Sequence, residues 1–191
     1  MQSVIFSTGN SEKFNIAHMA CKAADMQLTQ SILDIPEIQG EDPEVIIRDK
    51  VQKAFDLLGK PVIVSDDSWN IPGLNGFPGA YMKSIDHWFT SEDFLNLTRP
   101  LEDRRIILVQ MLAYQDSERQ RVFRKEYTGS MLTEARGDYG KPIQKVISMP
   151  GDNGLSVSEV YDQGAAHTER PVSATWHHFI QWYQENIPHS N

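Results

Sequence analysis

The sequence predicts a single α/β domain over residues 1–191, and three observations carry this prediction. A short apolar strand, VIFS at 4–7, runs directly into a helical pattern, and a second strand, PVIVSDD at 61–67, follows another helical pattern. The continuous apolar character of the second strand is typical of a strand covered by helices on both faces. Farther along, Asp-Ser-Glu at 116–118 joins two strand-like runs, which indicates an antiparallel hairpin.

Apolar periodicity and capping residues locate the elements of the first third of the chain. The first helix has Asn10 or Ser11 as its cap, and the second ends at Gly59, which suits a glycine cap. In order, we expect a helix over residues 11–26, a strand over 27–33, an acidic loop over 34–44, a helix over 45–59 and a strand over 61–67.

The rest of the chain alternates between shaped loops and regular elements. We expect a loop rich in Gly and Pro over 69–81, a helix over 91–97 capped by Ser91, hairpin strands over 104–115 and 119–129, irregular chain over 136–171 and an amphipathic helix over 171–187. Within that last helix, core positions are favoured for the residues at helical spacing, namely Trp176, Phe179, Ile180 and Tyr183.

Composition limits the possible partners. The 191 residues carry 18 Lys plus Arg against 26 Asp plus Glu, so the net charge of -8 argues against a protein that coats nucleic acid or an acidic membrane. Cys21 is the single cysteine and cannot form an internal disulfide, and no apolar stretch approaches the roughly 20 residues that span a bilayer. We therefore expect a cytoplasmic protein that binds neither nucleic acid nor membrane.

The stretch STGNSEK, residues 7–13, places small polar residues between a strand and a helix N-terminus. Backbone N–H groups and the helix dipole attract anions at such a position. Lys13 lies in the first helical turn, where acidic residues are normally preferred, and a bound phosphate would explain it. The alternative is a tight turn in which Gly9 supplies backbone freedom and Asn10 or Ser11 caps the helix.

Two further segments of the chain are rich in carboxylates. Glu37, Glu41 and Asp42 lie in the acidic loop, and Asp66 and Asp67 end the second apolar strand. Because Mg²⁺ that also holds phosphate oxygens needs few protein ligands, carboxylates from two segments suit it. The alternative for the acidic loop is a solvated surface segment. The glycine-rich stretch GLNGFPGAY either turns the chain or presses its backbone against a ligand.

Over residues 3–83 the chain resembles the inosine triphosphate pyrophosphatase family. STGNSEK, DIPEIQGEDPE leading to Lys50, VIVSDD and GLNGFPGAY occur in the order and at about the spacing seen there. The resemblance implies a long mixed sheet bent into two lobes with flanking helices and an active cleft between the lobes. It also implies a homodimer and the Mg²⁺-dependent cleavage of a nucleoside triphosphate to the monophosphate and pyrophosphate.

Roles in the site follow from the same resemblance, residue by residue. The residues that match positions holding the triphosphate are Thr8, Gly9, Asn10, Lys13 and Lys50, and Lys13 is also a candidate for catalysis. Glu37 matches a metal-binding glutamate, and Asp66 matches an aspartate that serves as metal ligand or base. If the alignment to the family motif were shifted by one residue, Asp67 would take the role of Asp66. Both therefore remain candidates for catalysis, and Asp67 is also a candidate for substrate binding. Trp69, which follows them closely, is placed to touch a ligand.

The resemblance weakens in the second half of the chain. An aromatic-Asp-Pro element that helps to hold the base is absent after Arg136-Gly137, and Ser173-Ala174-Thr175 replaces the usual Ser-His-Arg. A lysine that normally lies farther along also has no counterpart. The alternatives that stay open are a pyrophosphatase for a modified purine, one for another modified or pyrimidine nucleotide, a catalytically silent nucleotide-binding module, and an unrelated α/β protein.

Overall fold

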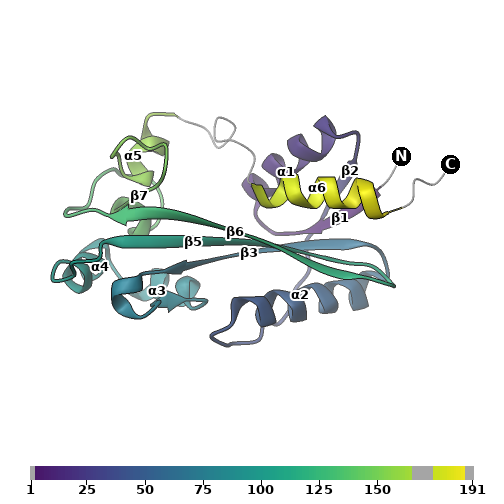
Figure 1. Ribbon diagram of the computed structural model, residues 1–191, viewed down its shortest axis with the longest axis horizontal. Coiled ribbons are helices and arrows are strands. Elements are labelled where there is room, and N and C mark those ends of the chain that lie inside the picture. Colours follow the sequence, from purple (N-terminus) through teal and green to yellow (C-terminus); the bar gives the residue numbers. More distant parts are fainter. Residues whose placement is uncertain (1–2, 165–173, 188–191) are drawn as a thin grey trace. The chain divides into compact units, whose positions relative to one another are not determined.

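A computed structural model of the chain describes residues 3–164 and 174–187 (Figure 1). The elements of its first half are β1 (Ser3–Ser7), α1 (Ser11–Ala23), β2 (Gln27–Ser31), α2 (Pro43–Leu58), β3 (Val62–Asn70), the 3-10 turn η1 (Pro72–Leu74), β4 (Pro78–Gly79), α3 (Met82–Trp88) and α4 (Ser91–Thr98). Those of its second half are β5 (Arg105–Gln115), β6 (Gln120–Met131), η2 (Pro142–Lys145), β7 (Ile147–Ser148), α5 (Val157–Asp162) and α6 (Ala174–Asn186).

The strands form one mixed sheet in the order β2-β1-β3-β5-β6-β7, and β4 pairs with β3. Strand β1 runs parallel to both β2 and β3, whereas β4 is antiparallel to β3 and β7 is antiparallel to β6. The prediction of an α/β chain with a mixed sheet is therefore confirmed. No helix in the described part of the chain is long and apolar enough to cross a bilayer.

The chain divides into two compact units. The first comprises Met1–Asp66, Gln110–Lys125 and Arg170–Asn191, and the second comprises Asp67–Val109 and Glu126–Glu169. In the first unit, α1 and α6 lie on one face of the strands and α2 lies on the other (Figure 1). The apolar strand β3 is thus covered on both faces within this unit, as its composition predicts.

The core of the first unit joins α1 and α6 to one face of the strands. Phe6 of β1 meets Trp176 of α6 edge to face, with ring centroids 5.2 Å apart. The cluster includes all the residues of the closing helix that were predicted as core: Trp176, Phe179, Ile180 and Tyr183. Cys21 is buried in the same cluster, and burial raises the pKa of its thiol to about 12, so this cysteine is an unreactive packing residue.

Helix α2 forms where several local signals agree. The Asp42 carboxylate caps it by accepting the N–H of Glu44 at 2.8 Å, and Pro43 occupies the first turn. Gly59 ends it in the left-handed conformation, with φ +59°, where a side chain would be strained. The buried face of the helix is apolar and includes Ile47 and Val51.

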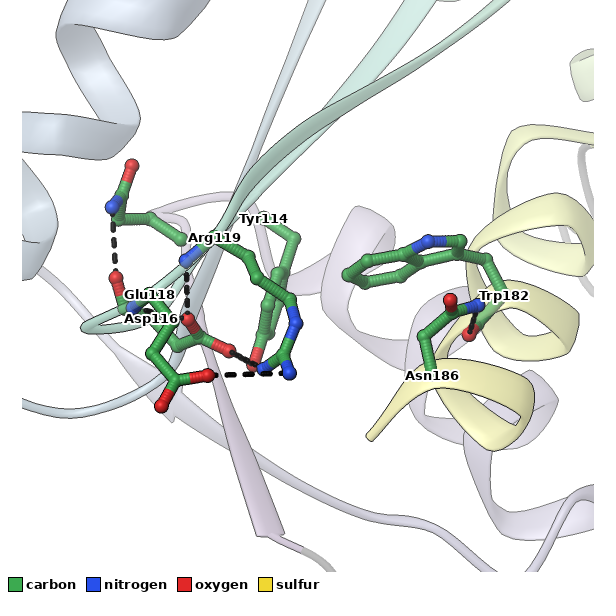
Figure 2. Close-up of polar contacts among 7 residues, drawn as sticks. Tyr114, Asp116, Glu118, Arg119, Trp182 and Asn186 are labelled. Atoms are coloured by element: carbon green, nitrogen blue, oxygen red, sulfur yellow. Dashed lines mark hydrogen bonds and ion pairs between the residues drawn. The ribbon is translucent and has the colours of Figure 1, made fainter. Parts of the chain in front are cut away.

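The predicted hairpin is confirmed, and its turn is organised by Asp116 (Figure 2). The Asp116 carboxylate accepts the N–H groups of Glu118 and Arg119 at 2.8 and 2.7 Å and the hydroxyl of Tyr114 at 2.9 Å. Burial alone would raise the pKa of Asp116, but these donors and the Arg119 guanidinium hold it below its usual value. Trp182 of α6 packs against Tyr114, with ring centroids 5.4 Å apart.

The second unit has a core of its own, built from α3, α4, α5 and η2 around the strands that it contains. Its largest fully buried side chains include Ile71, Phe94 and Ile106. Trp69 packs against this core and is partly buried.

Four expectations about the elements need correction. Strand β3 continues to Asn70 because Trp69 and Asn70 pair with Gly79 and Pro78 of β4. Helix α4 is capped by Thr90, whose hydroxyl and Asp93 form a capping box, and not by Ser91. Helix α3, which we did not expect, is held by the burial of Met82 and Ile85. Within the segment predicted to be irregular, η2, β7 and α5 are regular, and Ser156 and Glu159 form the capping box of α5.

Candidate functional site

The loop between β1 and α1 is built by Asn10. Its side-chain oxygen accepts the N–H groups of Glu12 and Lys13, both at 3.0 Å, and the Thr8 hydroxyl oxygen accepts the N–H of Asn10 at 3.1 Å. Asn10, rather than Ser11, is therefore the cap of α1. The cap uses two N–H groups that a helix N-terminus would offer to an anion. A phosphate at this position would therefore depend on the Lys13 ammonium and on the loop before the cap.

Gly9 is exposed, and neither its conformation nor its surroundings explain it. Its φ does not lie in the left-handed region, and a Cβ added to it would meet no atom within 4 Å. The alternative that Gly9 supplies backbone freedom for a tight turn is therefore wrong. A glycine with open space around it suits a close approach between the backbone and a ligand.

The strand register places this loop near the aspartates. Ser7 at the end of β1 pairs with Val64 of β3, and the Thr8 N–H donates to the carbonyl of Ser31 at 3.0 Å. Thr8 thus follows directly after the paired residues, and Asp66 lies two residues beyond Val64. Neighbouring strands are about 4.8 Å apart. The loop that begins at Thr8 therefore lies beside the part of β3 that contains Asp66.

Glu37 and Lys50 meet directly. The Lys50 ammonium lies 2.7 Å from the Glu37 carboxylate, and it also donates to the carbonyl of Ser65 at 3.4 Å. Lys50 therefore joins the acidic loop to the residue before Asp66. A second lysine of α2 fixes the same loop, because Lys53 donates to the carbonyl of Pro36 at 2.9 Å.

Asp66 and Asp67 lie within β3 and not at its end as expected, because the pairing with β4 prolongs the strand. Successive side chains of a strand point to opposite faces. Ile63 belongs to the core between the strands and helices α1 and α6, so Asp66, an odd number of residues away, lies on the other face. That face carries α2 and hence Lys50 (Figure 1). Asp67 points to the face opposite Asp66.

The other predicted acidic residues have different roles. Asp42 caps α2, as described above, and Glu41 is exposed. Within the described ranges, no group of three His, Cys, Asp or Glu side chains is arranged to hold a metal ion. Any metal site built from Glu37 and Asp66 would therefore contain two carboxylates and would need oxygen atoms from the substrate or from water.

In the second unit, residues 136–141 form a loop clamped by α5. The Asp162 carboxylate accepts the N–H groups of Asp138 and Tyr139 at 2.7 and 3.1 Å. Gly137 has φ +85°, and a Cβ there would lie 2.5 Å from the Ser158 hydroxyl, so glycine is required. The segment that replaces the aromatic-Asp-Pro element is therefore ordered.

Sequence reasoning missed Asp86 of α3. Its carboxylate is almost fully buried and lies 3.2 Å from the Lys141 ammonium, and burial raises its pKa despite this ion pair. Asp86 carries no signal in the sequence, because its partner is 55 positions away and the two residues meet only in the folded chain.

Comparisons with known proteins place the chain in a family. The family model described as the Ham1 family matches residues 4–164. The dITP/XTP pyrophosphatase of Methanopyrus kandleri is 26% identical over 185 residues, which cover 96% of this chain and 97% of the relative. The inosine triphosphate pyrophosphatase of Batrachochytrium dendrobatidis is 32% identical over 144 residues, 73% of each chain.

Solved structures show the same fold. The structure of a HAM1 protein from Coxiella burnetii superposes with a TM-score of 0.76 at 17% identity, covering 97% of this chain and 100% of the other. The Staphylococcus aureus Ham1 protein also has a TM-score of 0.76, at 18% identity, and covers 98% of this chain and 100% of the other. The alternative of an unrelated α/β protein is wrong, because the family model matches residues 4–164.

Proposed function

This chain belongs to the Ham1 family, and we propose from this premise that it removes nucleoside triphosphates with non-standard bases from the nucleotide pool. It is a nucleoside triphosphate pyrophosphatase, which cleaves its substrate to the monophosphate and pyrophosphate. The substrates named for its relatives, dITP, XTP and inosine triphosphate, are the first candidates. The observation that carries the site assignment is the contact of Glu37, Lys50 and Ser65 next to Asp66.

We propose that Mg²⁺ is the metal and that Glu37 and Asp66 hold it. Carboxylate oxygens are the donors that Mg²⁺ prefers, and two carboxylates with substrate phosphates are a usual set. The ion would neutralise charge on the polyphosphate when bound. Strand alternation supports this pair, because it places Asp66 on the face that carries α2 and Lys50, the partner of Glu37.

The other residues of the proposal bind and orient the triphosphate. Thr8, Gly9 and Asn10 form the loop that lets the phosphates approach the backbone, and Lys13 and Lys50 stabilise the negative charge that moves onto pyrophosphate. A carboxylate of the Asp66-Asp67 pair orients water toward the α-phosphorus. The water oxygen forms a bond to that phosphorus as the carboxylate accepts the water proton, the bond from the phosphorus to the α–β bridging oxygen breaks, and pyrophosphate leaves.

The test is pyrophosphate release across ITP, XTP, dITP and the standard nucleoside triphosphates, with the wild type, Asp66→Asn and Asp67→Asn. We expect release from at least one non-standard purine nucleotide and a loss of about 100-fold or more in kcat for Asp66→Asn. A larger loss in Asp67→Asn would transfer the role to that residue. If the wild type released no pyrophosphate from any of these nucleotides, a nucleotide-binding module would be favoured.

We further propose, on the resemblance alone, a cytoplasmic homodimer. Sedimentation equilibrium of the purified chain would give twice the mass of 21.7 kDa for the dimer. A single species at the monomer mass would contradict this assignment and leave the catalytic proposal unaffected.

A further inference from the structure

Lys50 and Glu37 form an ion pair, yet the proposed function assigns them ligands of opposite charge. Glu37 is assigned to the metal and Lys50 to the phosphates, yet here their charged atoms lie 2.7 Å apart. The Lys50 side chain is only 18% exposed, so its ammonium is largely withdrawn from water and depends on Glu37 and the Ser65 carbonyl for partners. In this arrangement the Lys50 ammonium occupies part of the Glu37 carboxylate.

A metal ion on Glu37 would change this balance. A divalent cation on the carboxylate would lie within a few ångströms of the Lys50 ammonium if the ion pair stayed in place. Like charges at that distance repel strongly in a partly buried site, where salt screens them poorly. Metal binding therefore requires Lys50 to move away, and binding of an anion to Lys50 requires it to leave Glu37.

We propose that Lys50 competes with the divalent cation for the Glu37 carboxylate, so that metal and polyphosphate bind cooperatively. This inference rests on the proposed function, which assigns Glu37 to the metal. Whichever ligand binds first breaks the ion pair and leaves the second group available to the other ligand. By linkage, the polyphosphate strengthens metal binding by the same factor as the metal strengthens polyphosphate binding. The site then assembles only when both ligands are present.

Helix α2 offers a matched control for this proposal. Lys53 lies one turn beyond Lys50, carries the same charge and contacts the same loop through the carbonyl of Pro36. Its carboxylate partner is Asp49, at 2.7 Å. Replacing Lys53 changes the net charge near the loop as much as replacing Lys50 does, but it leaves the ion pair at Glu37 intact.

The experiment measures Mn²⁺ binding without nucleotide, by the electron paramagnetic resonance signal of free Mn²⁺. We expect Lys50→Met to bind Mn²⁺ about 5- to 150-fold more tightly than the wild type, the usual range of coupling between sites. Lys53→Met should gain clearly less than Lys50→Met, because the Lys53 ammonium pairs with Asp49 and does not occupy the Glu37 carboxylate. The double variant Glu37→Gln, Lys50→Met should lose the gain. Unchanged or weaker binding in Lys50→Met, or an equal gain in Lys53→Met, would overturn the proposal.

A reciprocal measurement covers the other ligand. In metal-free buffer, calorimetry with tripolyphosphate should show tighter binding to Glu37→Gln than to the wild type, because Lys50 no longer has its carboxylate partner. Equal or weaker binding to this variant would contradict the competition. Circular dichroism of each variant confirms that it is folded.

The Mn²⁺ measurement and the activity assay test the competition and the proposed function separately. If the wild type releases pyrophosphate but Lys50→Met gains no Mn²⁺ affinity, the competition is wrong and the function stands. If the affinity gain is present but no nucleotide is cleaved, the competition stands and the proposed hydrolysis is wrong.

Discussion

At Gly9 the fold requires no glycine, so the ligand-binding role proposed for this residue can be tested separately from folding. The backbone angle is accessible to other residues, and the space that a Cβ would enter is open. Gly59 is the contrast, because its φ of +59° closes helix α2 and disfavours any side chain. The two glycines look alike in sequence, but only the one at 59 is required by the fold.

Gly9→Ala should therefore weaken nucleotide binding without changing stability. We expect KM for the preferred nucleotide to rise several-fold while Tm stays within about 1–2 °C, because no folded-state contact is disturbed. Gly59→Ala is the control and should lower the free energy of unfolding by about 1 kcal/mol with KM unchanged. A clear loss of stability in Gly9→Ala at unchanged KM would show that the loop needs the glycine for its own conformation.

At the scale of elements, the sequence predicts those whose signals are local. Helix α2 carries its cap, its first-turn proline and its terminal glycine within its own sequence, and the hairpin carries Asp116 in its turn. The capping boxes at Thr90 and Ser156 are also local signals, but neither was predicted. Ser91 competed with Thr90 as the cap of α4, and the irregular composition around Ser156 gave no sign of a helix. Ser91 instead donates to the carbonyl of Pro142.

Elements that depend on tertiary contacts were not predictable in this way. Strand β3 is longer than predicted because its last residues pair with β4, and the sequence of β3 alone does not predict that pairing. Helix α3 contains few strong helix formers and forms because Met82 and Ile85 are buried against the second core. For the candidate site, the motifs named the residues, and their roles stay predictions. The ion pair of Glu37 with Lys50 and the face of β3 that carries Asp66 became visible only in the folded structure.

The hairpin turn gives a prediction for acid stability. The pKa of Asp116 is held below its usual 3.8, so its stabilisation is present above that pH and is lost as the pH falls through the lowered pKa. Asp116→Asn should lower the free energy of unfolding by about 1.5–3 kcal/mol at pH 7, since a charged acceptor is lost. Urea titrations between pH 7 and 2.5 should show the difference from the wild type shrinking below about pH 4.

Glu118→Gln is the matched control in the same turn. Glu118 is mostly exposed and pairs with Arg119 only at 3.2 Å, so its replacement should change stability by less than about 0.5 kcal/mol at pH 7. If Asp116→Asn were as mild as this control, the hydrogen bonds of the turn would not stabilise the hairpin.

At the scale of the whole molecule, the proposed function requires a chain with a net charge of -8 to bind a ligand that is also strongly negative. The proposed site would resolve this by local charge: Lys13 follows β1, Lys50 contacts Ser65 within β3, and the proposal assigns Glu37 and Asp66 to a cation. The family assignment agrees, since the match over residues 4–164 extends through both units. The family resemblance assigns base recognition to the second half of the chain, where the sequence departs most from the family motifs. Ser173, which belongs to one of the replaced motifs, lies outside the described residues.

The most direct test of the central claim is to identify the bond that is cleaved. Turnover of ITP and XTP with Mg²⁺ in ¹⁸O-labelled water, followed by phosphorus NMR, reports both the products and the phosphorus atom that receives the water oxygen. We predict nucleoside monophosphate and pyrophosphate, with the label in the monophosphate. Release of inorganic phosphate, or label in pyrophosphate, would contradict attack at the α-phosphorus and with it the proposed mechanism.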